Sequence, residues 1–87
     1  MNAGSGGQRP GIVVIDVHNM NCYQARTLID SRLKSAGGSV YRIRIVHGYN
    51  SGTALRDMIY ETYSGRVKRI ERRSNPGETD LVLRELI

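Results

Sequence analysis

The sequence contains a single cysteine, Cys22, and neither tryptophan nor phenylalanine. A lone cysteine cannot form a disulfide within the chain, so a disulfide scaffold and a zinc site built from several cysteines are both excluded. No apolar run approaches the roughly 20 residues that a helix needs to cross a bilayer. The first residues also lack the apolar stretch of a secretion signal. Together these absences predict a cytoplasmic protein with no membrane partner.

The length of 87 residues predicts one small domain. Such a domain has room for one modest core and one site, because it buries only about 60% of the surface of its unfolded chain. The apolar fraction of 39% is too high for a disordered chain. We expect the glycine-rich residues 1–11 to form a flexible tail and residues 12–87 to form the folded domain, as a monomer.

Hydrophobic patterning divides the folded part into six elements. Strands are predicted at 12–17, 40–46, 66–72 and 79–86, and helices at 22–35 and 53–63. Asn21 and Gln24 have the spacing of a capping box at the start of the first helix. The first two strands, joined through a helix, should form a right-handed parallel crossover, and a four-residue turn at 75–78 should join the last two as a hairpin. The order predicts an α/β two-layer sandwich, β-α-β-α-β-β, with a mixed four-stranded sheet and two helices on one face.

Positive charge dominates the sequence. Lysine and arginine together exceed the acidic residues by 13 to 8, and the isoelectric point is about 9.9. Residues 66–73 hold five basic residues, among them Lys68 and Arg69, and Arg42 and Arg44 share one face of the second predicted strand. A basic domain rich in arginine is typical of nucleic-acid binding. A solvated basic face is the alternative, and these four residues are candidates for phosphate contacts.

Both histidines are expected at one edge of the sheet. Asp16 and His18 stand at the end of the first predicted strand, and His47 and Gly48 follow the second. Carboxyl ends of parallel strands meet at one edge, where open α/β sheets bind ligands. Two imidazoles near one phosphate could act as general base and general acid, because histidine titrates near neutral pH. Asp16, His18 and His47 are therefore the candidate catalytic residues, with Asp16 orienting an imidazole.

The loop at 47–52 leads into the second predicted helix. A helix start offers free N–H groups and partial positive charge to an anion. The loop lacks the lysine ending of a P-loop, but its glycines allow close approach of a ligand, and a tyrosine could stack on a base. The residues expected to contact nucleic acid here are Gly48, Tyr49, Asn50, Ser51, Gly52 and Arg56.

Two motifs resemble those of the Smr (small MutS-related) domain family. Asp-Val-His at 16–18 resembles the L-D-x-H-G motif that ends the family's first strand. His-Gly at 47–48, with Gly52 and Ala-Leu-Arg at 54–56, resembles its H-G-x-G-x-G-x-L-R motif. Gly77 before the last strand resembles a closing G-x-T-x-V-x-L pattern. The sequence departs from the family at Asn19, where Gly is usual, and at Tyr49-Asn50, which replace Lys-Gly and remove a phosphate contact.

The resemblance covers about residues 12–87 and carries several implications. It implies a fold like the C-terminal domain of bacterial translation initiation factor three. It also implies nucleic-acid binding with endonuclease activity, by DNA nicking or RNA cleavage, including cleavage of messenger RNA on stalled ribosomes.

The candidate catalytic residues favour RNA as the substrate, because RNA supplies its own 2′-OH nucleophile, whereas DNA hydrolysis normally uses a metal-activated water. We expect no tightly bound metal, and Mg²⁺ or Mn²⁺ only if the substrate is DNA. The alternative is a non-catalytic module that binds nucleic acid or a ribosome.

Overall fold

The computed structural model of the chain describes residues 10–49 and 53–85. Its elements follow the predicted order: β1 (Ile12–Asp16), α1 (Cys22–Ser35), β2 (Arg42–Val46), α2 (Ala54–Tyr63), β3 (Arg69–Arg72) and β4 (Glu78–Val82). Most of the predicted tail lies outside the described residues, as do three predicted contact residues of the loop between β2 and α2, namely Asn50, Ser51 and Gly52.

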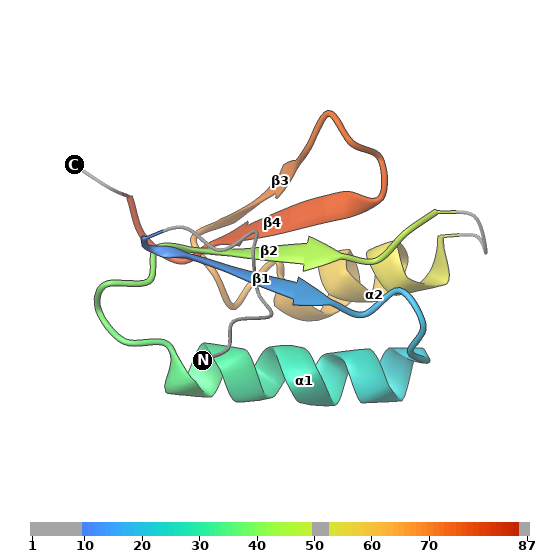
Figure 1. Cartoon of the computed structure of the whole chain (residues 1–87), viewed down its shortest axis with the longest axis horizontal. Coiled ribbons are helices and arrows are strands. Elements are labelled where there is room, and N and C mark those ends of the chain that lie inside the picture. Colours follow the sequence, from blue (N-terminus) through green and yellow to red (C-terminus); the bar gives the residue numbers. More distant parts are fainter. Residues whose placement is uncertain (1–9, 50–52, 86–87) are drawn as a thin grey trace.

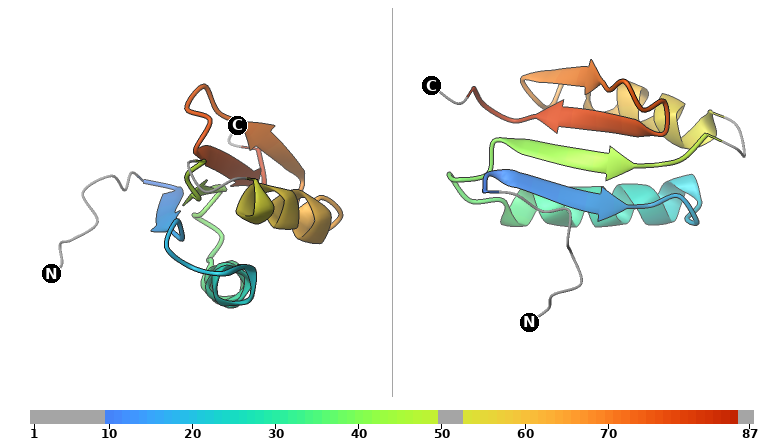
Figure 2. Two further views of the ribbon diagram at one scale, coloured as in Figure 1. Left: turned by 90° about the vertical axis from the view of Figure 1, so that its right-hand side faces the viewer. Right: turned by 45° about the horizontal axis from the view of Figure 1, so that its top comes forward.

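The four strands form one mixed sheet in the order β1-β2-β4-β3. β1 pairs with β2 in parallel, while β4 pairs antiparallel with both β2 and β3. Figure 1 shows the strands side by side, and the end-on view in Figure 2 shows α1 and α2 on the same face of the sheet. Within the described residues no helix covers the opposite face. The predicted two-layer α/β sandwich with a mixed four-stranded sheet and two helices is confirmed.

The third strand begins three residues later than the sequence pattern indicated. The backbone N–H groups of Arg66 and Val67 donate to the carbonyl oxygen of Tyr63, at 2.9 and 3.2 Å. These bonds satisfy a free carbonyl at the end of α2 and hold the chain in a turn. Pairing with β4 therefore starts only at Arg69. The last strand likewise ends at Val82, four residues before its predicted end at 86.

The first helix begins with the predicted capping box. Asn21 Oδ1 accepts a hydrogen bond from the backbone N–H of Gln24 at 2.8 Å, and Gln24 Oε1 accepts one from the backbone N–H of Asn21 at 3.0 Å. The two reciprocal bonds fix the start of α1 directly after the loop that follows β1. Neither this helix nor α2 is long and apolar enough to cross a membrane.

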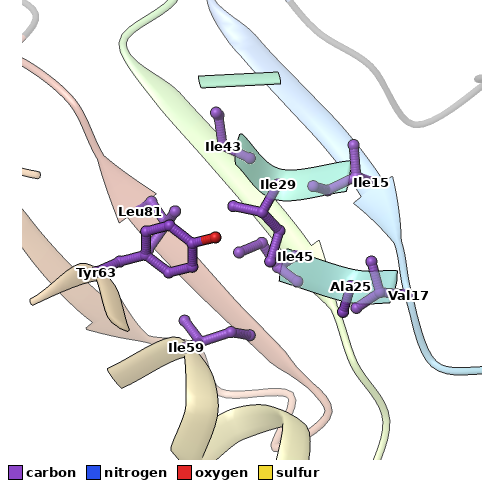
Figure 3. Packing of buried hydrophobic residues seen from close by; sticks show 9 residues of the cluster. All are labelled: Ile15, Val17, Ala25, Ile29, Ile43, Ile45, Ile59, Tyr63 and Leu81. Atoms are coloured by element: carbon purple, nitrogen blue, oxygen red, sulfur yellow. The ribbon is translucent and has the colours of Figure 1, made fainter. Parts of the chain in front are cut away.

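One hydrophobic core fills the space between the sheet and the two helices (Figure 3). Ile43 and Ile45 of β2 are fully buried, whereas Arg42 and Arg44 alternate with them on the opposite face, as predicted. The buried cluster consists of Ile15, Val17, Ala25, Ile29, Ile43, Ile45, Ile59, Tyr63 and Leu81. The core therefore ties both helices to the three strands β1, β2 and β4.

Tyr63 gives the fold a predictable response to alkaline pH. Its side chain is fully buried, and its hydroxyl donates to Asp30 Oδ1 at 2.7 Å. Burial, together with the bond to this carboxylate, raises the pKa of Tyr63 above its ordinary value of 10.0. The folded state thus favours the protonated phenol. Its contribution to stability is complete below the unfolded pKa and is lost as the pH rises through the folded pKa.

We therefore expect the free energy of unfolding to fall above about pH 10. The fall should be steeper in the wild-type protein than in Tyr63→Phe, which has no phenol to ionise. Urea denaturation at a series of pH values between about 8 and 11 measures both slopes. Equal slopes for the two proteins would show that Tyr63 does not contribute to the alkaline response.

Candidate functional site

Several parts of the fold meet at one end of the sheet, which we call the site edge. β1 and β2 end there, α1 and α2 begin there, and the turn between β3 and β4 lies beside them, at the right-hand end of Figure 1. Backbone N–H groups in the first turn of a helix carry partial positive charge. Two helix starts at one edge therefore make it favourable for anions.

Asp16 and His18 form a hydrogen-bonded pair at the site edge. His18 Nδ1 lies 2.5 Å from Asp16 Oδ1, and the backbone N–H of His18 donates to the same oxygen at 3.0 Å. An ionised carboxylate only accepts hydrogen bonds, so Nδ1 carries the hydrogen, and Nε2 of the neutral ring keeps its lone pair. Both side chains are about half exposed, His18 by 50% and Asp16 by 57%. A ligand can therefore reach the imidazole.

The ionisation of Asp16 is set by its bonds to His18. Partial burial by itself would raise the pKa of this carboxyl group. The hydrogen bonds from the ring and from the backbone of His18 outweigh that effect and leave the pKa of Asp16 below its ordinary value of 3.8. Asp16 is thus a carboxylate at neutral pH and holds the imidazole in one tautomer and one orientation, as orienting carboxylates do in catalytic triads.

His47 stands in a different environment from His18. It is 4% exposed, and both of its ring nitrogens have protein partners. Nδ1 lies 2.7 Å from the carbonyl oxygen of Gly48, to which it can only donate. Nε2 lies 2.8 Å from Thr79 Oγ1 in β4. In the neutral ring Nε2 therefore accepts from the Thr79 hydroxyl, and the imidazole joins the end of β2 to β4.

The His47–Thr79 bond is expected to contribute measurably to stability. Thr79→Val keeps the shape of the side chain but leaves Nε2 of a buried imidazole without its partner. Such a loss costs about 1–3 kcal/mol of unfolding free energy. Urea denaturation measures it, with Thr27→Val as the control, because Thr27 is exposed on α1. Equal unfolding free energies of the Thr79→Val and wild-type proteins would show that the His47–Thr79 bond does not stabilise the fold.

Two glycines allow the end of β2 to approach the turn between β3 and β4. Gly48 has φ +74°, a conformation that other residues rarely adopt, and a Cβ there would lie 3.3 Å from His18 Cβ. A Cβ on Gly77 would lie 3.2 Å from Gly48 Cα. The carbonyl oxygen of Gly77 accepts from the backbone N–H groups of His47 and Gly48, at 2.9 and 3.0 Å. This close packing brings His18, His47 and β4 together.

A cleft of about 290 Å³ opens between the starts of the two helices. His18 and His47 both line it, together with Asn21, Cys22 and Leu55. A neighbouring hollow of about 300 Å³ is lined by Asp16, His18, Gly48, Tyr49 and Asn75, among others. His18 lies between the two hollows, and Tyr49 is 59% exposed beside it. The structure thus brings Asp16, His18, His47, Gly48 and Tyr49 to one place.

Arg42 and Arg44 lie on the helix-free face and are occupied by ion pairs. Arg42 Nη1 lies 2.6 Å from Asp80 Oδ2 and 2.8 Å from Glu71 Oε1. Arg44 Nε lies 3.1 Å from Asp80 Oδ1. Asp80 is fully buried beneath these guanidinium groups. The two arginines are therefore largely neutralised, and they lie away from the cleft.

The other basic residues predicted to contact nucleic acid are divided between the two ends of the sheet. Arg56 lies in the first turn of α2 at the site edge, 3.8 Å from Asp57. Lys68 donates its backbone N–H to Val82 at the opposite end, where β4 finishes. Arg69 pairs with Glu71 at 2.8 Å and also with Glu85. Only Arg56 of these residues is close to the candidate site.

Sequence reasoning missed two residues of the site edge, Thr79 and Arg72. Thr79 holds His47, and Arg72 lies directly opposite Thr79 in the register of β3 and β4. The pattern Thr-Asp-Leu-Val-Leu at 79–83 indicates a buried ion pair at Asp80, because a charged residue lies inside an apolar strand, but it does not indicate the contact of Thr79 with His47. Arg72 belongs to the basic run at 66–73, but strand pairing decides that it lies beside Thr79 at the site edge.

Within residues 10–49 and 53–85, no group of three or more histidine, cysteine, aspartate or glutamate residues is placed to hold a metal ion.

Comparison with known proteins does not assign the chain to a family, because no protein-family model, no curated protein and no solved structure matches it. The resemblance to Smr domains therefore rests on the motif residues and their positions.

Proposed function

We propose that this chain is an Smr-type domain that binds nucleic acid and cleaves RNA as an endonuclease. The observation that carries the proposal is the exposed Asp16–His18 pair beside the cleft at the start of both helices. A carboxylate-oriented imidazole with a free nitrogen is suited to general base catalysis. The helix starts supply N–H groups for phosphate oxygens, and the net charge of +5 favours a polyanion.

The chemistry suggested by this arrangement uses the RNA's own nucleophile. His18 Nε2 takes the proton of a 2′-OH group while the 2′ oxygen attacks the adjacent phosphorus. The bond from phosphorus to the 5′ oxygen breaks, that oxygen takes a proton from water, and the hydroxide that remains takes the proton back from the His18 imidazolium. The products are a 2′,3′-cyclic phosphate and a free 5′-OH. Asp16 stabilises the imidazolium that forms, because its carboxylate accepts the hydrogen bond from Nδ1.

In this proposal His47 positions other groups rather than transferring a proton. Both of its ring nitrogens are bonded within the protein, at 2.7 and 2.8 Å. Its role is to hold Gly48 beside His18 and against β4. Arg56, one residue after Leu55 of the cleft, supplies positive charge at the start of α2.

A non-catalytic module that binds RNA, alone or on a ribosome, is the second candidate. The observation that favours it is that His18 is the only imidazole at the site edge whose Nε2 lacks a partner among the described residues. A site with one free acid–base group is less complete than one with two. In that case the same edge would bind a phosphate backbone and leave it intact.

Incubation with labelled substrates separates the two candidates. Single-stranded RNA, a stem-loop RNA and supercoiled DNA are each incubated with the protein, in EDTA and in Mg²⁺ or Mn²⁺. Cleavage of RNA in EDTA that ends in a cyclic phosphate supports the proposal. Nicking of DNA alone, and only with metal, contradicts the preference for RNA. Binding that weakens with salt, without cleavage of any substrate, supports the non-catalytic module.

A further inference from the structure

A third hollow, of about 190 Å³, lies at the site edge on the other side of His47 and Thr79. Arg56 of α2, Arg72 at the end of β3 and Ser74 of the following turn contribute to its lining. Thr79 lines it as well and binds His47, which lines the cleft of His18. The two hollows are therefore neighbours, separated by one hydrogen-bonded pair of side chains.

The register of β3 and β4 explains why Arg72 faces this hollow. Arg72 is opposite Thr79, and paired residues of neighbouring strands share a face of the sheet. Thr79 points toward the helices, where it contacts His47, so Arg72 lies on the helix side near α2. Arg73 pairs with Glu78 at 2.7 Å and with Asp80 at 3.5 Å, and Arg73 and Glu78 also contribute to the lining of this hollow.

Two guanidinium groups at this hollow are available to a ligand. Among the described residues, none of the ion pairs involves Arg72, which is exposed. The ion-pair partner of Arg56 in the part of the chain that the structure describes is the adjacent Asp57, at 3.8 Å and in an exposed position, so this contact is weak. Arg42, Arg44, Arg69 and Arg73 are all held by closer carboxylates. Among the described residues, the unpaired arginine charge of the site edge is thus concentrated in this hollow, which neighbours the cleft of His18.

We infer that Arg56 and Arg72, with the hydroxyl of Ser74, bind a backbone phosphate next to the one that His18 would act on. Two planar guanidinium groups suit the oxygens of a phosphodiester, and consecutive positions of α2, Leu55 and Arg56, line the two neighbouring hollows. The identity of the ligand rests on the proposed function. This second phosphate site predicts the path of the bound RNA, which runs from the cleft of His18, past His47, to the end of β3.

Fluorescence anisotropy with a labelled single-stranded RNA tests this inference in the full chain. Arg72→Gln is expected to raise Kd about tenfold, since a charged hydrogen bond contributes roughly 1.5 kcal/mol or more. It should also lower the slope of log Kd against log salt by about 0.7. Arg32→Gln is the matched control, because it removes the same charge from the last turn of α1, away from the site edge.

Equal weakening by the two variants, or no weakening by Arg72→Gln, would overturn the inference, as would wild-type protein that binds no RNA. An acidic peptide of glutamates is tested in parallel. Arg72-dependent binding of that peptide, tighter than binding of RNA, would assign the surface to a protein partner and overturn the inference as well. Anisotropy measures affinity and not cleavage, so the two proposals can fail separately. If RNA binding depends on Arg72 and the cleavage assay described above detects no product, the nuclease proposal is refuted and the phosphate site remains supported.

Discussion

Replacing His18 by alanine is expected to lower the rate of RNA cleavage by about 10²- to 10⁴-fold, the usual contribution of a general base. The affinity for RNA should change little, because the proposed phosphate contacts come from backbone N–H groups at the helix starts and from arginine side chains rather than from the His18 ring. Single-turnover cleavage under saturating protein gives the rate, and anisotropy gives Kd. His18 is half exposed, and within residues 10–49 and 53–85 its side chain bonds only to Asp16, so the variant should keep the stability of the wild-type protein.

His47→Gln provides the contrast that tests the different roles of the two histidines. It removes a buried ring that joins Gly48 to Thr79, so its main expected effect is a lower free energy of unfolding. The folded fraction of this variant should still cleave far faster than His18→Ala. A His47→Gln protein with wild-type stability and no cleavage would show that His47 transfers a proton.

The pH dependence of cleavage and the Asp16→Asn variant together test the role of the Asp16 carboxylate. The pKa of Asp16 lies below its ordinary value because of the bonds from His18, so the carboxylate stays ionised throughout the range in which histidine titrates. A loss of cleavage between about pH 7 and 5 would therefore report protonation of an imidazole, not of Asp16. Asp16→Asn should lower the rate and leave Kd unchanged or slightly improved, because it removes a negative charge near the phosphate.

Replacing Asp80 by asparagine is expected to destabilise the fold more than Thr79→Val does. Asp80 is fully buried on β4. Its carboxylate oxygens lie 2.6 Å from a guanidinium nitrogen of Arg42, 3.1 Å from one of Arg44 and 3.5 Å from one of Arg73. Desolvation alone would lower the pKa of Arg42, but its bonds to Asp80 and Glu71 outweigh this and raise it. In the variant these guanidinium groups therefore keep their charge but lose the carboxylate that compensates it.

The cost of Asp80→Asn is about 3–5 kcal/mol, the usual result of leaving buried charge uncompensated. That is a large share of the roughly 5–15 kcal/mol that a small domain typically has. Urea denaturation measures it, with Glu71→Gln as the control, since Glu71 is 34% exposed and its partner Arg42 keeps Asp80. The midpoint of Glu71→Gln should change little. An unchanged midpoint for Asp80→Asn would mean that the arginines on this face are adequately solvated without it.

The sequence by itself determined the local elements and the order in which they occur. Alternation of Ile43 and Ile45 with Arg42 and Arg44 predicted which side of β2 would be buried, because side chains of a strand alternate. Asn21 with Gln24 predicted the start of α1, because a capping box forms between neighbours three residues apart. The ends of strands were less predictable. At β3 the backbone N–H groups of Arg66 and Val67 bond to the carbonyl oxygen of Tyr63 at the end of α2, so these residues do not pair with β4.

The sequence also indicated the edge at which the candidate site lies. Asp16 and His18 bond across two residues, so their pairing follows from the local chain at the end of β1. His47 and Gly48 reach the same edge because β1 and β2 are parallel, which the helix between them requires.

Only the tertiary structure decided what each charged or polar group contacts. The partner of His47 is Thr79, 32 residues away, and the partner of Arg42 is Asp80, 38 residues away. Both contacts exist because β4 inserts between β2 and β3, and nothing in the local sequence fixes that strand order. The same pairing turns Arg72 toward Arg56 and Arg73 toward Asp80. Charge composition predicts a basic protein, but strand order decides which arginines remain free for a phosphate.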